Sequence, residues 1–342
     1  LEAIEKTLWV PSISKNRIKS MVKDRPDWCV SRQRVWGVPI TVFLNKSTGD
    51  ILRDPKVIER IAYEVEKKGA DAWFTEDPQI FLGDKYNSDE YECVQDILDV
   101  WFDSGSTHSF VLNSEKQKWP ADLYLEGSDQ HRGWFQSSLL ESCGTRGRAP
   151  FNAVLTHGFV LDGQGRKMSK SIGNVISPQE IMKQSGADIL RLWVAMTDVT
   201  EDVRISPEVL KGVSESYRRL RNTIRFTIGA LNDYEESEFV DLDKMPELEK
   251  WVLHRLKELD LSLKKAVDSY TFQAFYSELN IFCSSDLSAF YFDIRKDSLY
   301  CDNTQNQVRR SARTVLYEVF KCLTAWLAPV ICYTAEEAWL AH

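Results

Sequence analysis

Between residues 122 and 185, the sequence twice alternates a short apolar run, a polar loop that contains glycine and a helix-forming stretch. The apolar runs cover residues 122–125 and 153–160 and have the composition of short strands. The helical stretch between them, through Ser137 and Leu140, makes a βαβ crossover, which is right-handed by the usual rule. The pattern therefore predicts an open, parallel α/β sheet. In such sheets ligands bind beyond the carboxyl ends of the strands.

The loop after the second apolar run is basic. Residues 166–174 read Arg-Lys-Met-Ser-Lys-Ser-Ile-Gly-Asn and follow a Gly-x-Gly turn. Lys167 and Lys170 form a mobile polycation, and lysine ammonium groups can follow phosphate oxygens whose charge changes during a reaction. The alternative is a solvated surface loop, because lysines and serines at this spacing are also common there.

A helix start follows the basic loop. Ser177 offers a capping hydroxyl, Pro178 suits the first helical position, and Glu180 lies three residues after the cap. The loop is therefore expected to join a buried strand to a helix, which is a common position for ligand-binding loops in open α/β sheets.

Polar residues also follow the first apolar run. Glu126, Gly127, Asp129 and Gln130 come directly after residues 122–125. A carboxylate, a glycine and an Asp-Gln pair at a strand end suit a ribose or an ammonium group, and the crossover would bring Glu126 and His157 to the same sheet edge. Acidic residues at a helix N-terminus, which complement the helix dipole, are the alternative interpretation.

Several segments resemble class I aminoacyl-tRNA synthetases, in the order expected for that class. Residues 167–171, Lys-Met-Ser-Lys-Ser, resemble its second signature. Residues 27–39, Asp-Trp-Cys-Val-Ser-Arg-Gln-Arg-Val-Trp-Gly-Val-Pro, are similar to the return into the catalytic domain in the isoleucine, valine and leucine enzymes. Residues 99–106 and 125–134 resemble the isoleucine enzymes specifically. The matches extend over nearly the whole chain.

This resemblance implies the second half of a class I nucleotide-binding, Rossmann-like parallel sheet and an ATP-dependent ligase. Isoleucyl-adenylate would form from ATP and isoleucine, and isoleucine would then pass to isoleucine tRNA. ATP with Mg²⁺ is the implied cofactor, and no protein-bound metal is expected. Valine and leucine enzymes are the nearest alternatives. An unrelated nucleotidyl transferase with the same loop would leave the other matches unexplained.

The resemblance also assigns residues by position. It implies catalytic roles for Lys167 and Lys170, with Lys170 on the triphosphate. It implies that the adenylate is bound by Glu126, Gly127, Asp129, Gln130, His157, Gly158, Phe159, Val160 and Lys170. It implies that Trp101 and Trp134 wall the isoleucine pocket, although tryptophans are equally common as plain core residues.

Other family features do not occur in this sequence. There is no His-x-Gly-His, the first signature of the class, because the five histidines are isolated at positions 108, 131, 157, 254 and 342. The large editing insertion expected before Asp27 and the zinc region expected toward the family's C-terminus are also missing. We therefore expect an internal fragment that cannot activate isoleucine alone. A non-catalytic tRNA-binding fragment is a further alternative.

After residue 206 the apolar residues recur at helical spacing without strand signals. Ser206-Pro207 is a helix start. Four stripes follow: Val213, Tyr217, Leu220, Ile224 and Ile228; Leu248, Val252, Leu256, Leu259, Leu263 and Val267; Phe275, Leu279 and Phe282; and Ala312, Leu316, Val319, Leu323 and Leu327. They predict α/β plus all-α architecture, with a catalytic part over 1–205, a small insertion at about 45–92, and a helical bundle over 206–342. This bundle resembles the anticodon-binding domain of the class.

Arg218, Arg221 and Arg225 form a cationic stripe on the first of these helices. The stripe is a candidate tRNA contact, and an ordinary solvated face is the alternative. The net charge of −8 argues mildly against a general nucleic-acid binder.

Composition restricts the remaining possibilities. The seven cysteines are odd in number and form no C-x-x-C pair, which is typical of reduced thiols in a cytoplasmic protein. No apolar span of bilayer length occurs, so we expect no membrane partner. Asp96, Asp99 and Asp103 lack an accompanying histidine or glycine-loop pattern, and we do not expect a metal site there. We expect a monomer.

Overall fold

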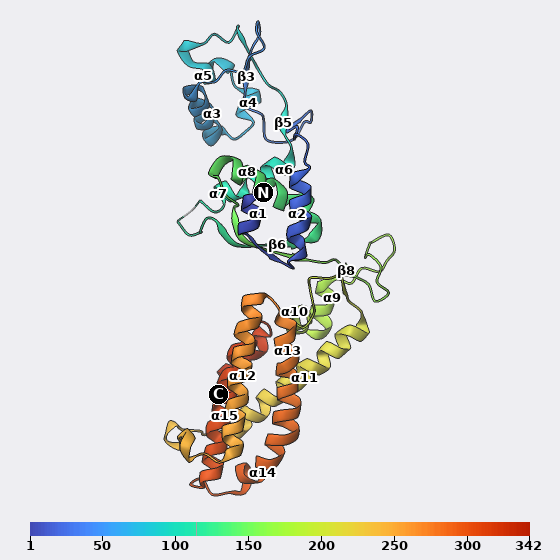
Figure 1. Ribbon diagram of the computed structural model, residues 1–342, viewed down its shortest axis with the longest axis vertical. Coiled ribbons are helices and arrows are strands. Elements are labelled where there is room, and N and C mark those ends of the chain that lie inside the picture. Colours follow the sequence, from blue (N-terminus) through green and yellow to red (C-terminus); the bar gives the residue numbers. More distant parts are fainter. Residues whose placement is uncertain (114) are drawn as a thin grey trace. The chain divides into compact units, whose positions relative to one another are not determined.

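The computed structural model describes residues 1–113 and 115–342, and the chain divides into two compact units, residues 1–156 and 157–342 (Figure 1). The first unit contains the predicted sheet, and the second contains the basic loop and the predicted helices. In these ranges no helix is long and apolar enough to cross a membrane.

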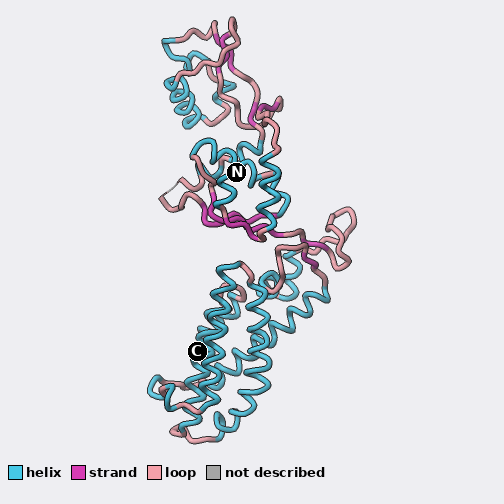
Figure 2. Tube along the Cα trace, in the orientation of Figure 1, coloured by secondary structure: helices cyan, strands magenta, loops and turns pink. Residues whose placement is uncertain are grey.

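The first unit contains a three-stranded parallel sheet, whose strands are magenta in Figure 2. Its order is β1 (Leu8–Val10), β7 (Phe151–His157), β6 (Ala121–Gly127), and β1 lies parallel to β7. Helix α8 (Trp134–Arg146) connects β6 to β7, which confirms the predicted crossover. Most of β7 is buried, as expected for a parallel strand covered on both faces.

Short helices complete the core around this sheet. Helices α1 (Glu2–Lys6) and α2 (Ile13–Lys23) flank β1, and the indole Nε1 of Trp9 donates to the carbonyl of Ile4 at 2.9 Å. The buried apolar cluster consists of Ile4, Trp9, Ile18, Tyr124, Phe135, Leu139, Ala149, Phe151 and Val154. This core fixes the sheet whose carboxyl edge carries the predicted site residues.

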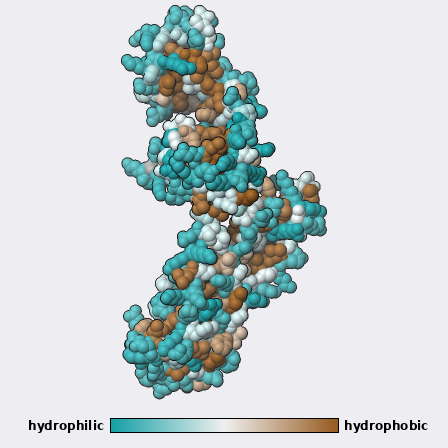
Figure 3. Space-filling view, in the orientation of Figure 1, coloured by the Kyte–Doolittle hydropathy of each residue, from teal (hydrophilic) through white to brown (hydrophobic). Residues whose placement is uncertain are grey.

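The predicted small insertion has a core of its own. Strands β3 (Phe43–Asn45) and β4 (Tyr91–Cys93) pair antiparallel. Helices α3 (Pro55–Lys68), α4 (Ala72–Thr75) and α5 (Pro78–Leu82) and the 3-10 turn η1 (Gly83–Lys85) lie between them in sequence. Its core contains Phe43, Val57, Ile61, Trp73, Phe81 and Leu82. Ile51 and Ile58 of this part are exposed, and Figure 3 shows apolar surface over it.

Helix α3 of the insertion has a capped start and a glycine at its end. The carboxylate of Asp54 accepts from the backbone N–H of Lys56 at 3.0 Å, so it caps α3. The helix stops at Gly69, whose φ of 82° is in the left-handed region that favours glycine.

The predicted strand over residues 153–160 was wrong in its extent. Strand β7 ends at His157, and a separate strand β8 (Val160–Leu161) pairs in parallel with β9 (Val203–Arg204). The chain changes partners at Gly158, whose N–H donates to the carbonyl of Val199 at 2.9 Å. The strand directly before the basic loop is β8, whose two residues are exposed or half-buried, and not the buried strand that the sequence suggested.

Helices dominate the second unit, as predicted. Helices α9 (Pro178–Ser185) and α10 (Ala187–Ala195) precede α11 (Pro207–Ala230). Then follow η3 (Glu236–Glu238), η4 (Leu242–Lys244), α12 (Glu247–Ser269), α13 (Phe272–Ile281), the π-helix η5 (Phe282–Tyr291), α14 (Phe292–Cys301), α15 (Gln307–Leu327) and α16 (Cys332–Leu340).

The predicted apolar stripes face the core of this unit with one exception, and the half-buried members Tyr217, Ile228, Leu248 and Leu263 pack against it. Every predicted stripe residue of α15 is buried, and Ser206 caps α11 through the N–H of Val209 at 3.3 Å. Val267 was a wrong prediction, because it is 49% exposed and Ala266 is the last buried residue of α12. The stripe ends there because α12 terminates at Ser269, where Tyr270 adopts a left-handed conformation.

A buried ion pair connects α12 to α14. Glu249 has no exposed surface, and its two carboxylate oxygens accept from Arg295 at 2.6 and 2.8 Å. The hydroxyl of Tyr291 donates to the same carboxylate at 3.1 Å. These partners compensate for burying the charge, which would otherwise be very unfavourable.

The acidic linker between α11 and α12 is held by arginines at the start of α15. Arg310 donates to the backbone carbonyls of Ser237 and Glu238, and Arg313 donates to the carbonyl of Asn232 at 2.9 Å. These contacts fix the linker against the bundle.

Candidate functional site

Strand β6 ends in residues that are predicted to bind the adenylate. Glu126 and Gly127 are its last two residues, and the 3-10 turn η2 (Ser128–Arg132) follows. Gln130 accepts from the backbone N–H of Trp134 at 3.1 Å and donates to the carboxylate of Asp129 at 3.1 Å. Gln130 therefore satisfies a free N–H at the start of α8 and orients the exposed Asp129.

His131 anchors this turn in the core. The ring is 1% exposed, and its Nδ1 donates to the carbonyl of Ser128 at 2.7 Å. It also packs against Trp9 and against the edge of Phe135. Burial lowers the pKa of His131, so its ring is neutral at pH 7. The polar run around it contains no signal that this histidine is internal.

Trp101 lies against the same turn. A side chain at Gly133 would place its Cβ 2.8 Å from the Trp101 ring and 2.6 Å from the amide oxygen of Gln130. A larger residue there would displace one of these side chains, so glycine allows the turn to approach helix α6 (Val100–Gly105), which carries Trp101. The indole is 42% exposed, which leaves part of its surface open.

Residues 27–39 hold the start of α6. Within them β2 (Ser31–Arg32) pairs antiparallel with β5 (Ile97–Leu98). The carboxylate of Asp99 accepts from the guanidinium of Arg32 at 2.6 Å and from the indole of Trp28 at 3.1 Å. Asp99 also caps α6 through the N–H of Trp101. Two segments that resemble the family separately are therefore joined in one hydrogen-bonded cluster.

Trp134 is half-buried and connects three elements. Its ring stacks on Tyr124 of β6, with centroids 4.1 Å apart and an interplanar angle of 7°. Its Nε1 donates to the carbonyl of Ser104 at 3.0 Å and lies 3.2 Å from the hydroxyl of Thr107, in helix α7 (Thr107–Phe110). The sequence prediction grouped Trp101 with Trp134, and the structure brings both to the turn after β6.

Two carboxyl groups lie between α6 and α8. Both carboxyl oxygens of Glu141 are enclosed and have no hydrogen-bond partner among the described residues. Burial, assisted by the charge of Asp103, raises the pKa of Glu141 to about 7. A carboxyl group that is partly neutral at physiological pH allows the two helices to pack closely. No pattern in the sequence indicates this pair.

The residues before the basic loop are fixed by the segment 199–204. The N–H of Phe159 donates to the carboxylate of Asp202 at 2.7 Å, and Nδ1 of His157 donates to the carbonyl of Gly158 at 2.7 Å. A Cβ at Gly158 would lie 2.3 Å from the backbone oxygen of Glu201. Residues 157–160 therefore have a defined backbone path that requires glycine at position 158.

The basic loop lies beside these residues. Lys167 faces Leu161 in an antiparallel bridge, and Leu161 directly follows Val160 in β8. Lys167 and Lys170 are exposed, and neither side chain forms a hydrogen bond or ion pair within residues 1–113 and 115–342. The structure thus brings the lysines and residues 157–160 together within the second unit and leaves both ammonium groups free for a ligand.

The helix after the loop begins where predicted but without the predicted cap. Helix α9 starts at Pro178, and Ser177 is its N-cap residue. The hydroxyl of Ser177 donates to the side chain of Gln179 at 2.7 Å instead of accepting from the helix backbone. The capping box expected from Glu180 was wrong for this reason.

The arginine stripe lies on the exposed side of α11. Arg218, Arg221 and Arg225 are all exposed, and none of them forms an ion pair in the part of the chain that the structure describes. Their guanidinium groups are therefore free to contact another molecule.

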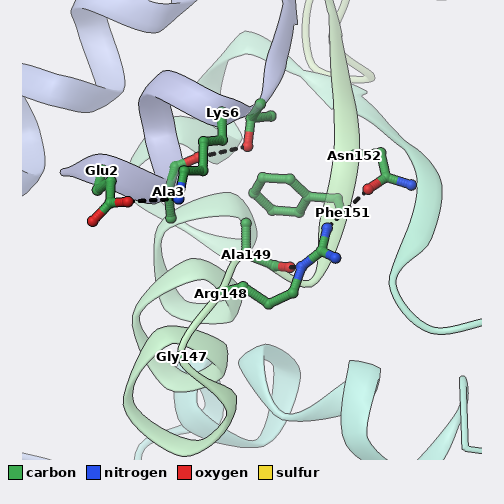
Figure 4. Close-up of a pocket in the computed structure, with 9 residues that line it drawn as sticks. Glu2, Ala3, Lys6, Gly147, Arg148, Ala149, Phe151 and Asn152 are labelled. Atoms are coloured by element: carbon green, nitrogen blue, oxygen red, sulfur yellow. Dashed lines mark hydrogen bonds and ion pairs between the residues drawn. The ribbon is translucent and has the colours of Figure 1, made fainter.

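One cavity of the first unit includes none of the predicted site residues. It has a volume of about 360 Å³ and is lined by Glu2, Ala3, Lys6, Thr7, Gly147, Arg148, Ala149, Phe151 and Asn152 (Figure 4). Phe151 begins β7, whereas the predicted residues follow the ends of β6 and β7. The cavity therefore lies at the opposite end of the strands. Within the described ranges no group of three or more His, Cys, Asp or Glu side chains could hold a metal ion.

Comparison with known proteins gives two family matches. The family described as tRNA synthetases class I (I, L, M and V) matches residues 1–206. The anticodon-binding domain of tRNA ligase matches residues 249–342.

Similar proteins agree with these matches. The isoleucine–tRNA ligase of Zymomonas mobilis is 58% identical over 99% of this chain, and that of Gluconobacter oxydans is 54% identical over 100% of it. The chain spans 37% and 36% of the length of these two relatives.

Solved structures show the same fold at low identity. A Mycobacterium tuberculosis methionyl-tRNA synthetase in complex with methionyl-adenylate superposes with a TM-score of 0.69 and 17% identity, and covers 97% of this chain and 58% of its own. A ternary LeuRS-tRNA-LeuAMS complex from Agrobacterium radiobacter superposes with a TM-score of 0.68 and 16% identity, and covers 96% and 43%. The family match to residues 1–206 covers more than half of the sequence, and the chain therefore belongs to the class I tRNA synthetases of the isoleucine, leucine, methionine and valine group.

Proposed function

We propose that this chain is part of an isoleucine–tRNA ligase, in which it binds the adenylate and the triphosphate of ATP. The observation that carries the proposal is the 58% identity, over 99% of the chain, with a relative named isoleucine–tRNA ligase. The free lysines of the basic loop and the polar residues after β6 support it, because they are the groups that such a reaction needs.

The proposed chemistry relies on positioning and charge. The carboxylate of isoleucine attacks the α-phosphate of ATP, pyrophosphate leaves, and isoleucine then passes from the adenylate to its tRNA. No covalent intermediate on the protein is needed, so the protein's contribution is to align the reactants and stabilise charge on the phosphate. Lys170, assisted by Lys167, would contact the triphosphate. Mg²⁺ would arrive with ATP as part of the substrate.

The residues that the resemblance assigns to the adenylate form two groups along the chain. Glu126 would contact the adenylate itself, and Gly127, Asp129 and Gln130 would line its ribose. His157, Gly158, Phe159 and Val160 would border the adenine. The absence of a side chain at Gly127 would let the backbone approach a nucleotide closely. Trp101 and Trp134 would form the apolar walls for the branched side chain of isoleucine.

Two further parts of the proposal concern the domain boundary and the activity of the isolated chain. We place the boundary between the catalytic part and the helical, anticodon-binding-type part before Ser206, the cap of α11. We expect residues 1–342 by themselves to be unable to activate isoleucine, because the other half of the ATP site, which carries the first signature of the class, does not occur in this sequence.

An ATP–pyrophosphate exchange assay tests the proposed function. A full-length ligase that carries this segment should exchange in the presence of isoleucine, and exchange much less with valine. The isolated chain should give only the background rate. A full-length enzyme that prefers valine would make the segment part of a valine enzyme. Clear exchange by residues 1–342 alone would overturn the expectation for the fragment.

The exposed arginines of α11 favour a second role in tRNA binding. Changing Arg218, Arg221 and Arg225 together to alanine should weaken tRNA binding and reduce the slope of log K against log salt concentration by about one for each phosphate that the stripe neutralises. Filter binding over a series of salt concentrations measures both quantities. Lys257→Ala with Lys265→Ala, on the exposed face of α12, is the matched control. An unchanged affinity and slope in the triple variant would show that the stripe does not touch phosphate.

A further inference from the structure

A buried carboxylate lies at the base of the basic loop. Asp162 follows β8 directly and is 6% exposed. Its Oδ1 accepts from the backbone N–H groups of Gln164 and Arg166, at 3.0 and 2.8 Å. Its Oδ2 accepts from the guanidinium of Arg166 and from the amide of Asn174, both at 2.9 Å. Every one of these donors belongs to the segment that contains the two lysines.

Asn174 closes the other end of the loop. Its Oδ1 accepts from the backbone N–H of Ser169 at 2.9 Å. Its Nδ2 donates to the carboxylate of Asp162 at 2.9 Å and to the carbonyl of Lys167 at 3.2 Å. One side-chain amide thus binds the backbone on both sides of Met168 while it is itself anchored to a buried charge, and both its donors and its acceptor are used.

This network fixes the backbone of the loop and leaves the lysine side chains free. Further bonds tighten it: the N–H of Gly173 donates to the carbonyl of Ser169 at 3.2 Å, and the N–H of Ile172 donates to the hydroxyl of Ser169 at 3.3 Å. The N–H donors around Asp162 hold the pKa of this carboxyl well below its usual range, so it is ionised at physiological pH. Charge-assisted bonds of this kind are stronger than neutral ones.

We propose that Asp162 and Asn174 are positioning residues that hold the loop backbone between them in one conformation, from which Lys167 and Lys170 contact the phosphates of ATP together. The proposal rests on the proposed function of the loop. Its physical reason is that a fixed backbone leaves only the two lysine side chains to be ordered when they contact the phosphates, which lowers the entropy cost of that contact. Neither residue needs to touch the substrate for this role.

Hydrogen exchange of the chain tests the structural half of the proposal. Asn174→Ala should increase the exchange rate of the Ser169 amide, and the rate of tryptic cleavage after Lys167 and Lys170, by about tenfold, since it removes three hydrogen bonds. Ser177→Ala is the matched control, because Ser177 lies in the same segment and its hydroxyl bonds to Gln179, outside the loop. The control should leave both rates unchanged.

Swapping the carboxylate and the amide between positions 162 and 174 tests whether the two residues act as a pair. Asn174→Asp alone places a second carboxylate beside Asp162 and should loosen the loop as much as Asn174→Ala does. The double variant Asp162→Asn, Asn174→Asp again places one amide donor opposite one carboxylate. It should return the hydrogen-exchange rate of the Ser169 amide to within about threefold of the rate in the unchanged chain. A double variant no better than Asn174→Asp would show that the pair is not the relevant unit.

Adenylation kinetics in a full-length ligase carrying this segment test the positioning role. Asn174→Ala should lower the rate constant for adenylate formation by about tenfold and change the KM for ATP much less, because the loss falls on the transition state. An unchanged exchange rate at Ser169, or faster exchange with unaltered adenylation, would overturn the proposal. A different result would overturn the proposed function of the loop itself: an adenylation rate constant that Lys170→Ala leaves unchanged.

Discussion

Replacing Lys170 by alanine in a full-length isoleucine–tRNA ligase that carries this segment is expected to lower the rate constant for adenylate formation by about 10²–10³. The ammonium group is exposed and unpaired among the described residues, so its removal breaks no internal bond of the free protein. The effect should therefore appear where negative charge develops, in the transition state, and much less in the affinity for ATP.

Single-turnover measurement of adenylate formation over a range of ATP concentrations separates these two effects. Lys183→Ala is the matched control, because Lys183 lies on the exposed face of α9, next to the loop in sequence, and outside the candidate site. An unchanged rate constant combined with a raised requirement for ATP would contradict the catalytic assignment of Lys170.

The second large effect is expected in the stability of the helical unit. Arg295→Ala should lower its free energy of unfolding by about 3–5 kcal/mol, because the buried carboxylate of Glu249 would lose both bonds to its charged partner. The remaining donor, the hydroxyl of Tyr291, cannot neutralise that charge. The pair as a whole need not be worth this amount, since replacement of both residues by apolar ones removes the buried charge as well.

Urea denaturation followed by circular dichroism at the helical wavelength measures the change. Lys296→Ala is the control for Arg295→Ala, because it removes the neighbouring cation, whose ion pair with Asp293 is exposed. The control should change stability by less than about 1 kcal/mol. Equal destabilisation of the two variants would show that burial of Glu249 does not determine the result.

The helical part of the fold could be predicted well from the sequence. Each long helix buries one face, so apolar residues recur at helical spacing, and the stripe of α15 is buried throughout. The crossover from β6 through α8 to β7 could be predicted for a similar reason, since both strands are short and largely apolar and the connection is long enough for a helix.

Other features depend on partners that are distant in sequence. The apolar run 153–160 continues through Gly158, and only the pairing with residues 199–204 shows that it divides into two strands. Glu249 and Arg295 are 46 residues apart, and a glutamate in a helix ordinarily indicates the solvent-facing side. The π-helix over Phe282–Tyr291 has no recognisable sequence signal.

The residues of the candidate site also include some that local patterns indicate and others that depend on partners distant in sequence. Residues at the strand ends and in the basic loop could be located from local pattern, because polar residues after a strand mark the ligand-binding edge of an α/β sheet. The residues that hold these site residues in place could not be predicted. Asp162, Asn174 and His131 look like ordinary loop residues in the sequence, and only their hydrogen bonds show what they support. The roles assigned to the site residues stay predictions.

The central claim, which is proposed from the resemblance of these segments to the family, is that residues 126–130 and the loop of Lys167 and Lys170 both take part in binding the adenylate. Hydrogen exchange of the full-length ligase, with and without a non-hydrolysable isoleucyl-adenylate analogue, tests it directly. The account predicts that the analogue slows exchange in residues 126–130 and in residues 157–170, with the same dependence on its concentration. Protection of only one of these segments, or saturation at different concentrations, would contradict the claim.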